Sequence, residues 1–475
     1  MDKINESEHN SLTLLSGDAA WLPRALLAEY NSTRPIGPQQ LLCHAPFKNI
    51  YFGHHGRAIA CCYNRTYTLG EYPKQSIKEI WFGKPAEKLR DYIRHNNLSS
   101  GCMGCHSQLS AGNFDAVKTK QYDELPFNGN KYPSVIEFEL SNVCNLECVM
   151  CSGNFSSLIR RKREQLPEIP MSYDEAFVGQ LDEFIPYLNE TKFYGGEPFL
   201  IDIYYRIWDR IIQLNPNARI SVQTNATIFN KRVESILKKA NVHINISLDS
   251  LIKETYEGIR VNAKFDHVME NLNLFYDYCK TKNTFFGIST CLMRNNWREA
   301  PAFIEFCNRL DVAVYFHTVF HPKYLALLSL GVDELNLIAD TYAAFDPPSD
   351  TPVQRKNRTH FLNLRSQVEA WKTNSAAEIS RVKVPDLCAL KMFLFSRVNS
   401  DKGLSDVRKG EIRNIIHARF NSIAERVTED VLKKSLDAVN LYDPNYDIDN
   451  MIRNIVNLPL EQLIEVVVAG GKGGS

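Results

Sequence analysis

Strand-like and helix-like patterns alternate regularly between residues 134 and 320. Strands are expected at 134–141, 191–196, 219–225, 241–249, 285–293 and 313–320, and helices at 174–188, 231–240 and 265–282. Strands that alternate with helices pair in parallel, with the helices packed outside the sheet. The six units therefore predict an α/β fold, either a doubly wound sheet or an incomplete barrel.

The segment 241–249 helps to choose between these two folds. Its apolar residues Val242, Ile244, Ile246 and Leu248 alternate with the polar residues His243, Asn245, Ser247 and Asp249. Successive side chains of a strand point to opposite faces, so one face is apolar and the other is polar. A parallel sheet that is packed on both faces would be apolar on both. A polar inner face indicates a cavity for a polar ligand, which an open barrel provides.

The remaining segments flank this barrel. Residues 1–38 are predicted to form an N-terminal arm, 39–130 a small cysteine-rich domain with a linker, 131–325 the partial barrel and 326–475 a helical region. Within the cysteine-rich segment, 76–96 is expected to be a helix, and 111–131 a linker.

Composition bears on the partners and on the cellular compartment of the protein. Lys plus Arg and Asp plus Glu are equal at 55 each, so net charge gives no support for a nucleic-acid partner. No apolar stretch has the length of a transmembrane helix, and the polar start MDKINESEHN lacks the features of a signal peptide. We therefore expect a cytoplasmic protein without a membrane partner. In a reducing compartment, 12 cysteines favour metal binding or catalysis over disulfides.

Three of these cysteines, Cys144, Cys148 and Cys151, follow the first barrel strand. They lie within a span of eight residues. Iron–sulfur clusters are normally held by four thiolates, so three thiolates on one loop would leave one iron open to a ligand. A structural zinc site is the alternative, but it normally has four ligands, and no fourth lies nearby in the sequence.

At this motif the chain resembles the radical S-adenosylmethionine (SAM) superfamily, in which three cysteines spaced x3 and x2 follow the first strand of a partial (βα)6 barrel. The resemblance implies a [4Fe–4S] cluster on Cys144, Cys148 and Cys151, with SAM on its open iron. The residue before the last cysteine is often aromatic in the family and packs on adenine. Here it is Met150, whose thioether offers a similar polarizable contact.

Further residues match the family's SAM-binding positions at the ends of strands. They are Gly195, Gly196, Glu197, Asn225, Ser247, Asp249 and Arg260. The first three belong to a GGEP motif that would accept hydrogen bonds from the SAM ammonium group, and Arg260 would contact the SAM carboxylate. Each position alone has a structural alternative, such as a turn or a helix cap. Their joint occurrence in order, at the carboxyl ends of strands, supports the resemblance.

A second cysteine set, Cys43, Cys61, Cys102 and Cys105, resembles part of the SPASM auxiliary-cluster motif. The later SPASM cysteines are missing, and the segment precedes the barrel, so it resembles a shortened, twitch-type domain moved to the N-terminal side. The resemblance implies an auxiliary [4Fe–4S] cluster. Two alternatives stay open, which are Cys62 as the ligand in place of Cys61 and zinc in place of the cluster.

The resemblance also implies a reaction. Flavodoxin or ferredoxin would supply an electron, and reductive cleavage of SAM would give a 5′-deoxyadenosyl radical that abstracts hydrogen from the substrate. The expected substrate is a ribosomally made peptide that is oxidised, crosslinked or epimerised. The alternatives are a radical SAM dehydrogenase of sugars or small molecules, and a non-catalytic Fe–S binding protein.

The sequence does not identify the catalytic acid or base, although Tyr315, His317 and His321 lie near the last strand. The basic run 160–163 is compatible with a tRNA-modifying role, but such a run is typical of a solvated helix face. The segment 458–471 resembles the end of a double-glycine leader peptide, or else forms an amphipathic helix.

Overall fold

The computed structural model describes residues 22–110, 112–114, 117–123, 132–378, 387–400 and 405–427, and isolated positions between 452 and 464. The chain divides into two compact units. One contains Ala25–His95 and Ser100–Ala376, and the other contains Met1–Arg24, Asn96–Ser99 and Ala377–Ser475. Residues 1–21 of the predicted arm and almost all of 458–471 lie outside the described residues.

A nine-stranded sheet in the order β3-β2-β1-β4-β5-β6-β7-β8-β9 forms the first unit. The six expected barrel strands are β4 (Val135–Phe138), β5 (Glu190–Phe193), β6 (Arg219–Thr224), β7 (Val242–Ser247), β8 (Phe286–Leu292) and β9 (Ala313–Thr318). Neighbours among these strands all pair in parallel. Strands β4 to β9 therefore form the predicted partial barrel, which leaves β9 at one edge of the sheet.

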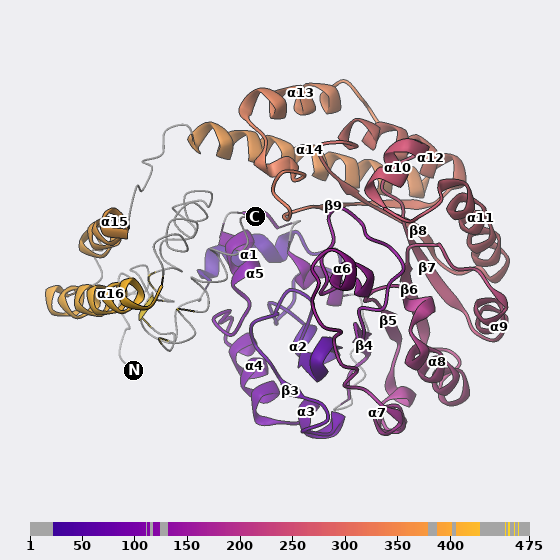
Figure 1. The fold of residues 1–475 in the computed structure, drawn as a ribbon, viewed down its shortest axis with the longest axis horizontal. Helices are drawn as coiled ribbons and strands as arrows, with labels where there is room; N and C mark the ends of the chain where they lie inside the picture. Colours follow the sequence, from indigo (N-terminus) through magenta and orange to yellow (C-terminus); the bar gives the residue numbers. More distant parts are fainter. Residues whose placement is uncertain are drawn as a thin grey trace. The chain divides into compact units, whose positions relative to one another are not determined.

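Helices cover the outer side of this curved sheet (Figure 1). They are α7 (Glu175–Leu181), α8 (Asp202–Leu214), α9 (Lys231–Lys239), α10 (Lys253–Ile259), α11 (Phe265–Lys282) and α12 (Ala300–Leu310). Local signals set their ends: the Asn230 side chain accepts hydrogen bonds from the first turn of α9, and α11 stops at Asn283 in the left-handed conformation. With helices on one side alone, the sheet is an open barrel and not a doubly wound sheet.

The predicted alternation of strand β7 is confirmed. Val242, Ile244 and Ile246 are at most 1% exposed, whereas the intervening His243, Asn245 and Ser247 keep accessible surface. The apolar face packs on α11, which contacts β7 and β8. The polar face is consequently the inner face of the barrel.

The cysteine-rich segment extends the same sheet. Strand β1 (Asn49–Phe52) pairs in parallel with β4, and β2 (Arg57–Ile59) and β3 (Gly70–Glu71) add to it in antiparallel fashion. Around these strands lie α1 (Arg24–Ser32), α2 (Ala45–Lys48), α3 (Ile77–Trp81), α4 (Lys84–Arg94), α5 (Met103–Ser110) and the 3-10 helix η2 (Lys118–Tyr122). Main-chain hydrogen bonds thus join the predicted auxiliary-cluster segment to the barrel.

The expectation of one continuous helix over 76–96 is wrong, because α3 and α4 are separated at Phe82 and Gly83. Pro85 occupies the first turn of α4. Proline has no amide hydrogen and its ring collides with the preceding turn, so it fits only the start of a helix.

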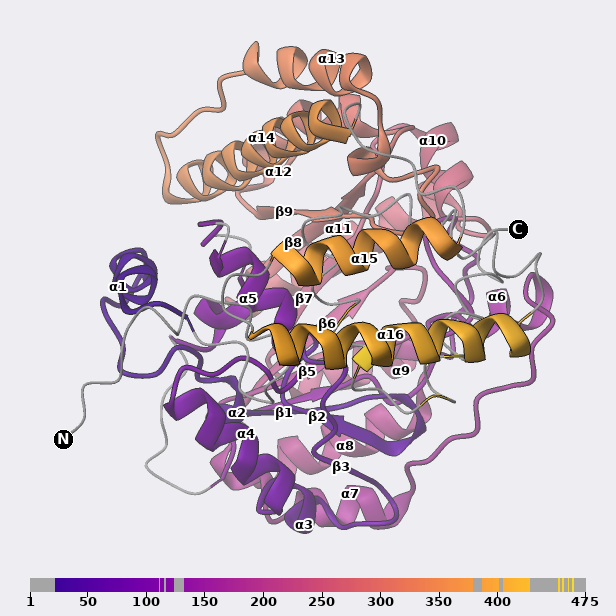
Figure 2. The same ribbon diagram turned by 90° about the vertical axis from the view of Figure 1, so that its left-hand side faces the viewer.

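After β9, α13 (Val332–Ala343) and α14 (Pro352–Glu378) follow. Helix α14 runs along the free edge of β9 (Figure 2). The Asn357 Oδ1 atom accepts a hydrogen bond from the Val314 amide at 2.9 Å, and His360 Nδ1 lies 2.6 Å from the Val314 carbonyl oxygen. These contacts satisfy main-chain groups that an edge strand would otherwise expose.

The second unit contains α15 (Leu387–Ser400) and α16 (Asp406–Arg426). Leu394 on α15 and Ile412, Ile416 and Phe420 on α16 belong to its separate apolar core. Among the described helices, none is long and apolar enough to cross a lipid bilayer.

Candidate active site

The loop with Cys144, Cys148 and Cys151 leaves the carboxyl end of β4 and is held by the segment that follows α10. The Glu147 amide donates to the Val261 carbonyl at 3.0 Å, and the Val149 amide donates to the Ile259 carbonyl at 2.9 Å. These two bonds bring Arg260 to the loop, where its Nη1 atom lies 4.0 Å from Cys148 Sγ.

The three thiols of this loop lie close enough to interact electrostatically. Burial and, to a smaller degree, the neighbouring thiols raise the pKa of Cys144 to about 11 and that of Cys151 to about 12. Burial also raises the pKa of Cys148, while the nearby Arg260 lowers it. Grouped, buried thiolates need a cationic partner, which the irons of a cluster would supply. The donor set therefore fits an iron–sulfur cluster.

Arg260 forms a buried ion pair beside this loop. Its Nη2 atom lies 2.7 Å from Asp249 Oδ2, and the two residues are 7% and 0% exposed. Asp249 also accepts a hydrogen bond from the Cys291 amide at 2.7 Å. The Arg260 Nε atom is buried without a hydrogen-bond partner among the described residues. One N–H donor of the guanidinium is thus not used by the described groups.

The GGEP motif packs against the start of the cysteine loop. Gly195 and Gly196 have φ angles of 81° and 44°. A Cβ atom on Gly196 would lie 2.0 Å from the Val143 carbonyl oxygen, and one on Gly195 would lie 2.6 Å from that of Ser141. The two glycines therefore permit a close approach of the GGEP backbone to the loop that carries the thiols.

The Glu197 side chain is fully buried and joins the ends of two strands. Its Oε1 atom accepts hydrogen bonds from Phe199 N and Thr224 Oγ1, at 3.2 and 2.8 Å, and Oε2 accepts from Asn225 N at 2.7 Å. The Asn225 side chain continues to Asn145 on the cysteine loop at 3.2 Å. The carboxylate therefore positions the loop and the end of β6, in addition to the SAM contact that the sequence predicted for it.

Burial raises the pKa of Glu197 from 4.5 to about 7, although its hydrogen bonds oppose the shift. Between these two pH values the folded state binds the extra proton, so stability falls as pH rises through this window. Glu197→Gln removes the titration. We expect the unfolding free energy of the variant, relative to wild type, to improve by about 2–3 kcal/mol from pH 5 to pH 8 in urea titrations.

The exposed Glu254 on α10 provides a matched control for that measurement. Glu254→Gln should follow the wild type across the same pH range. A constant difference between wild type and Glu197→Gln would contradict the assignment of the titration to this carboxyl.

Met150 lies against a small apolar cluster at the ends of β8 and β9. The buried members of the cluster are Ile259, Met293 and Val319, and Met150 and Val149 pack on it while remaining partly accessible. An accessible methionine beside an apolar surface offers a flat, polarizable contact of the kind an adenine ring takes.

A hydrogen-bonded ladder crosses the inner face of the barrel over β6, β7, β8 and β9. Gln223 Nε2 donates to Ser247 Oγ at 2.7 Å, and Asn245 Nδ2 donates to Gln223 Oε1 at 2.7 Å and to Ser289 Oγ at 2.8 Å. Ser289 Oγ lies 3.1 Å from His317 Nε2. The Asn245 Oδ1 atom is buried without a partner among the described residues, so it can accept a hydrogen bond from a ligand.

His317 ends this ladder and keeps an accessible side chain, yet burial lowers its pKa to about 4. Its imidazole is therefore neutral near pH 7. The sequence indicated a polar inner face at β7 but did not identify Ser289. Its signal is the alternation along Gly287, Ser289 and Cys291 in β8.

The second cysteine set comes together beside β1 and β2. Cys43, Cys61 and Cys105 are each 9% exposed, and Cys102 is half-buried. Burial raises the pKa of Cys102 to about 12, followed by the effect of Cys105. The Cys43 pKa is raised by burial and then by Cys105 and Cys102, and that of Cys61 by burial and then by Cys43. The four predicted auxiliary ligands thus form one electrostatic group.

Cys62, the alternative to Cys61, faces other neighbours. Burial raises its pKa to about 11, and the charges that act on it next are Glu137, Lys118, Arg65 and Lys192. Glu137 and Lys192 belong to β4 and β5. The structure therefore groups Cys61 with the other three thiols and turns Cys62 toward charged barrel residues.

In the part of the chain that the structure describes, no three His, Cys, Asp or Glu side chains are placed to hold one metal ion. A single zinc ion draws its four ligands to one centre, whereas each thiolate of a [4Fe–4S] cluster binds a different iron.

Comparison with known families agrees with this geometry. Residues 138–307 match the Radical SAM superfamily, and residues 43–106 match the SPASM iron–sulfur cluster-binding domain. The chain therefore contains a radical SAM domain. Its SPASM domain lies on the N-terminal side of the radical SAM domain, as the cysteine spacing indicated. The two domains imply [4Fe–4S] clusters and SAM as the cofactors of this radical SAM protein.

Its curated relatives include GTP 3′,8-cyclases. The protein of Clostridium botulinum is 24% identical over 186 residues, which cover 38% of this chain and 54% of the relative. The chain therefore spans about half the length of this relative. The protein of Chlorobaculum tepidum is 21% identical over 318 residues, which cover 64% of this chain and 90% of the relative.

Two solved structures are similar over part of the chain. Native anSMEcpe with bound AdoMet is 19% identical with a TM-score of 0.35, and the match covers 44% of this chain and 59% of that one. Streptococcus suis SuiB bound to the precursor peptide SuiA is 12% identical with a TM-score of 0.34, over 53% of this chain and 60% of that one.

Proposed function

We propose that this radical SAM enzyme modifies a peptide through hydrogen abstraction, with Cys144, Cys148 and Cys151 as the ligands of the SAM-binding cluster. Cys43, Cys61, Cys102 and Cys105 are the proposed ligands of the auxiliary cluster. The observation that carries the proposal is the position of both thiol groups on one sheet, because β1 from the SPASM segment pairs directly with β4.

The protein groups around the cysteine loop have distinct proposed roles. Bound SAM and its reduced cluster supply a 5′-deoxyadenosyl radical, and flavodoxin or ferredoxin is the proposed reductant. Arg260 orients the SAM carboxylate through its unpartnered Nε–H. The accessible Met150 supports the adenine ring, and Gly195, Gly196, Glu197, Asn225, Ser247 and Asp249 shape the rest of the site.

The inner face of the barrel supports a peptide substrate. Asn245 Oδ1 is an unused acceptor, and the neighbouring ladder carries donors and acceptors that match the amide groups of a main chain. Neutral His317 at the end of the ladder can accept or donate a proton. SPASM and twitch proteins, which the N-terminal segment resembles, mostly modify ribosomally made peptides or act as dehydrogenases on sugars and small molecules.

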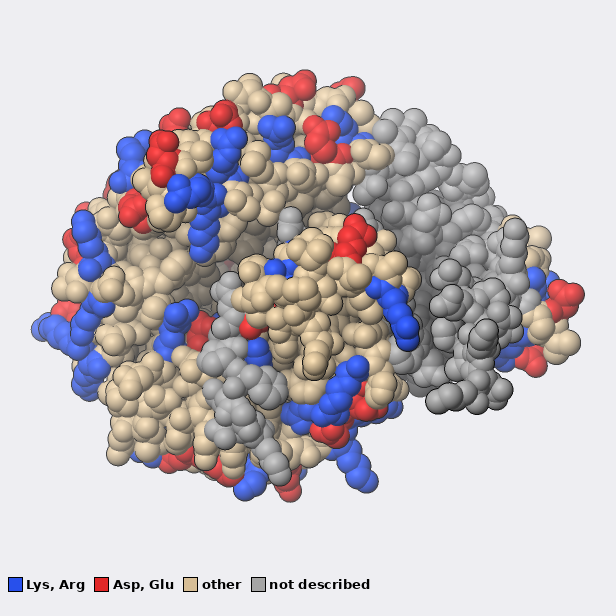
Figure 3. All heavy atoms as spheres, turned by 180° about the vertical axis from the view of Figure 1, so that it is seen from behind, with Lys and Arg blue, Asp and Glu red and all other residues tan. Residues whose placement is uncertain are grey.

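Several observations speak against a nucleic-acid substrate. Basic and acidic side chains are both scattered over the face in Figure 3, without one extended basic surface. The basic run 160–163 also contacts the cysteine loop, since Arg163 Nη1 donates to the Glu147 and Cys148 carbonyls at 3.3 Å.

Each described cysteine side chain is a free thiol, which suits the reducing cytoplasm as the proposed location.

A small-molecule substrate is the second candidate. The observation that favours it is that aligned relatives from Clostridium botulinum and Chlorobaculum tepidum are named GTP 3′,8-cyclase. A nucleotide would occupy the same inner face as the proposed peptide.

Transfer of deuterium into 5′-deoxyadenosine tests the proposal and separates the two substrates. The reduced, cluster-loaded protein is incubated with SAM and either a pool of uniformly deuterated peptides or deuterated GTP. Mass spectrometry should detect deuterium in 5′-deoxyadenosine with the peptide pool. Deuterium with GTP alone would contradict the peptide assignment, and absence of SAM cleavage under strong reductant would contradict the enzyme assignment.

A further inference from the structure

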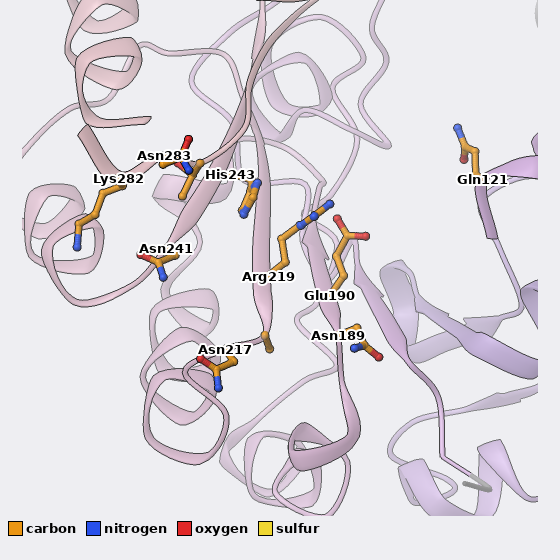
Figure 4. Close-up of a pocket in the computed structure, with 11 residues that line it drawn as sticks. Gln121, Asn189, Glu190, Asn217, Arg219, Asn241, His243, Lys282 and Asn283 are labelled. Carbon is orange, nitrogen blue, oxygen red and sulfur yellow. The ribbon is translucent and has the colours of Figure 1, made fainter. Parts of the chain in front are cut away.

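A polar pocket lies at the amino ends of the barrel strands, opposite the end that carries the cysteine loop. Its volume is about 590 Å³, and residues at the start of β5, β6, β7 and β8 line it. Pockets of this size hold small-molecule ligands. Glu190, Arg219 and His243 rise from neighbouring strands in the same direction (Figure 4). None of these residues belongs to the SAM-binding positions described above.

Four loops contribute the same residue type to the rim of this pocket. An asparagine stands shortly before each of the four strands: Asn189, Asn217, Asn241 and Asn283. Their side-chain amides make no hydrogen bonds with described residues. Each amide carries two N–H donors, so each of the four loops carries donors at the rim.

The charged groups of the pocket favour an anion. The exposed Arg219 guanidinium forms no ion pair or side-chain hydrogen bond with described residues. Lys282 also lines the pocket, but its Nζ atom donates to the Lys238 carbonyl at 3.4 Å and points away from Arg219 in Figure 4. The single carboxylate, Glu190, accepts a hydrogen bond from Ser221 Oγ at 2.8 Å and lies 3.9 Å from Lys192 Nζ. Its charge is therefore compensated outside the pocket, while that of Arg219 is not.

His243 supplies a neutral donor. Its Nδ1 atom accepts a hydrogen bond from the Phe285 amide at 3.0 Å, which leaves the proton on Nε2. Burial, and then the charge of Arg219, lowers its pKa to about 4, so the ring is uncharged near pH 7. Arg219 and the His243 Nε2–H are thus donors on neighbouring strands (Figure 4), and paired donors of this kind bind carboxylate or phosphate oxygens.

We propose that this pocket is a binding site for a small, multiply charged anion that carries carboxylate or phosphate groups, separate from the SAM and substrate sites. The Arg219 guanidinium is its main anchor, since its planar donors can engage two oxygens of one group. The proposal is independent of the substrate that the enzyme modifies.

Calorimetric titration of the cluster-loaded full chain tests the proposal, with saturating SAM present so that the SAM site is filled. The probes are inorganic pyrophosphate and citrate. At least one should bind with a Kd below about 1 mM at low salt. Tighter binding of pyrophosphate would identify phosphate as the recognised group, and tighter binding of citrate would identify carboxylate.

Two variants and one control locate the site. Arg219→Gln should weaken binding at least tenfold. Asn283→Asp keeps a side chain that tolerates the left-handed conformation, adds a negative charge at the rim and should also weaken binding. Arg309→Gln removes an exposed cation on α12 and should bind as wild type does. No binding of either probe, or unchanged affinity in both pocket variants, would overturn the proposal.

Discussion

Replacement of Cys144, Cys148 and Cys151 by alanine should abolish SAM cleavage and remove about four irons per chain from a wild type that carries about eight. The three thiols form one electrostatic group on one loop, and the triple variant removes all of them together. The rate of 5′-deoxyadenosine formation should fall by at least about 10³-fold, because the whole cluster is lost, including the iron that would bind SAM. Anaerobic iron, sulfide and zinc analysis measures the first effect, and chromatography of 5′-deoxyadenosine measures the second.

Single variants refine this experiment. Cys279→Ala alters a buried thiol on α11 and should leave iron content and SAM cleavage unchanged. Cys61→Ala should lower iron by about four, whereas Cys62→Ala should not, because Cys62 faces Glu137. Retained zinc in place of iron at the N-terminal set would contradict the auxiliary cluster and favour a structural site. Iron that survives the triple replacement would contradict the assignment of the SAM cluster.

The second large effect is expected at the buried ion pair. Arg260→Met leaves the Asp249 carboxylate without its cation in a site where both residues are almost fully buried. Breaking a buried pair by removing one partner typically costs about 3–5 kcal/mol of unfolding free energy. We expect a loss of this size in urea unfolding of the cluster-loaded protein. The Kd for SAM should rise as well, since Arg260 is the proposed carboxylate contact.

The double variant Asp249→Asn, Arg260→Met separates these two effects. It removes both charges, so most of the lost stability should return, and the sum of the two single costs should exceed the cost of the double variant. SAM affinity should remain low, because the guanidinium is still absent. Additive costs would show that the two side chains do not stabilise each other. Recovered SAM affinity would exclude Arg260 as the carboxylate contact.

Patterns that repeat within one strand or one helix were readable from the sequence. The alternation of Val242 to Asp249 predicted the inner and outer faces of β7, and the spacing of Cys144, Cys148 and Cys151 predicted the loop after the first barrel strand. Both patterns depend on neighbours in the chain, whose geometry is fixed by the strand or loop itself. The expectation of a continuous helix over 76–96 was wrong, although the break before Pro85 was also readable, because proline fits only the first turn of a helix.

Contacts that depend on the register between strands could not be read in this way. The ion pair of Asp249 and Arg260 forms because α10 returns the chain to the end of β7, and no spacing rule predicts that return. Likewise, Ser289 and His317 meet because β8 and β9 pair with Ser289 opposite Tyr315. The fold class and the positions of the thiols were therefore predictable, whereas the network between them required the structure.

The pairing of β1 with β4 has a consequence for any attempt to separate the two domains. The residues from Asn49 to Phe52 supply the hydrogen-bonding partners of one whole edge of the barrel. A chain shortened to begin at residue 131 would present β4 as a bare, apolar edge, which is a template for pairing with other molecules. The SPASM segment thus completes the sheet of the barrel in addition to carrying the proposed cluster ligands, and it cannot be exchanged between enzymes as an independent module.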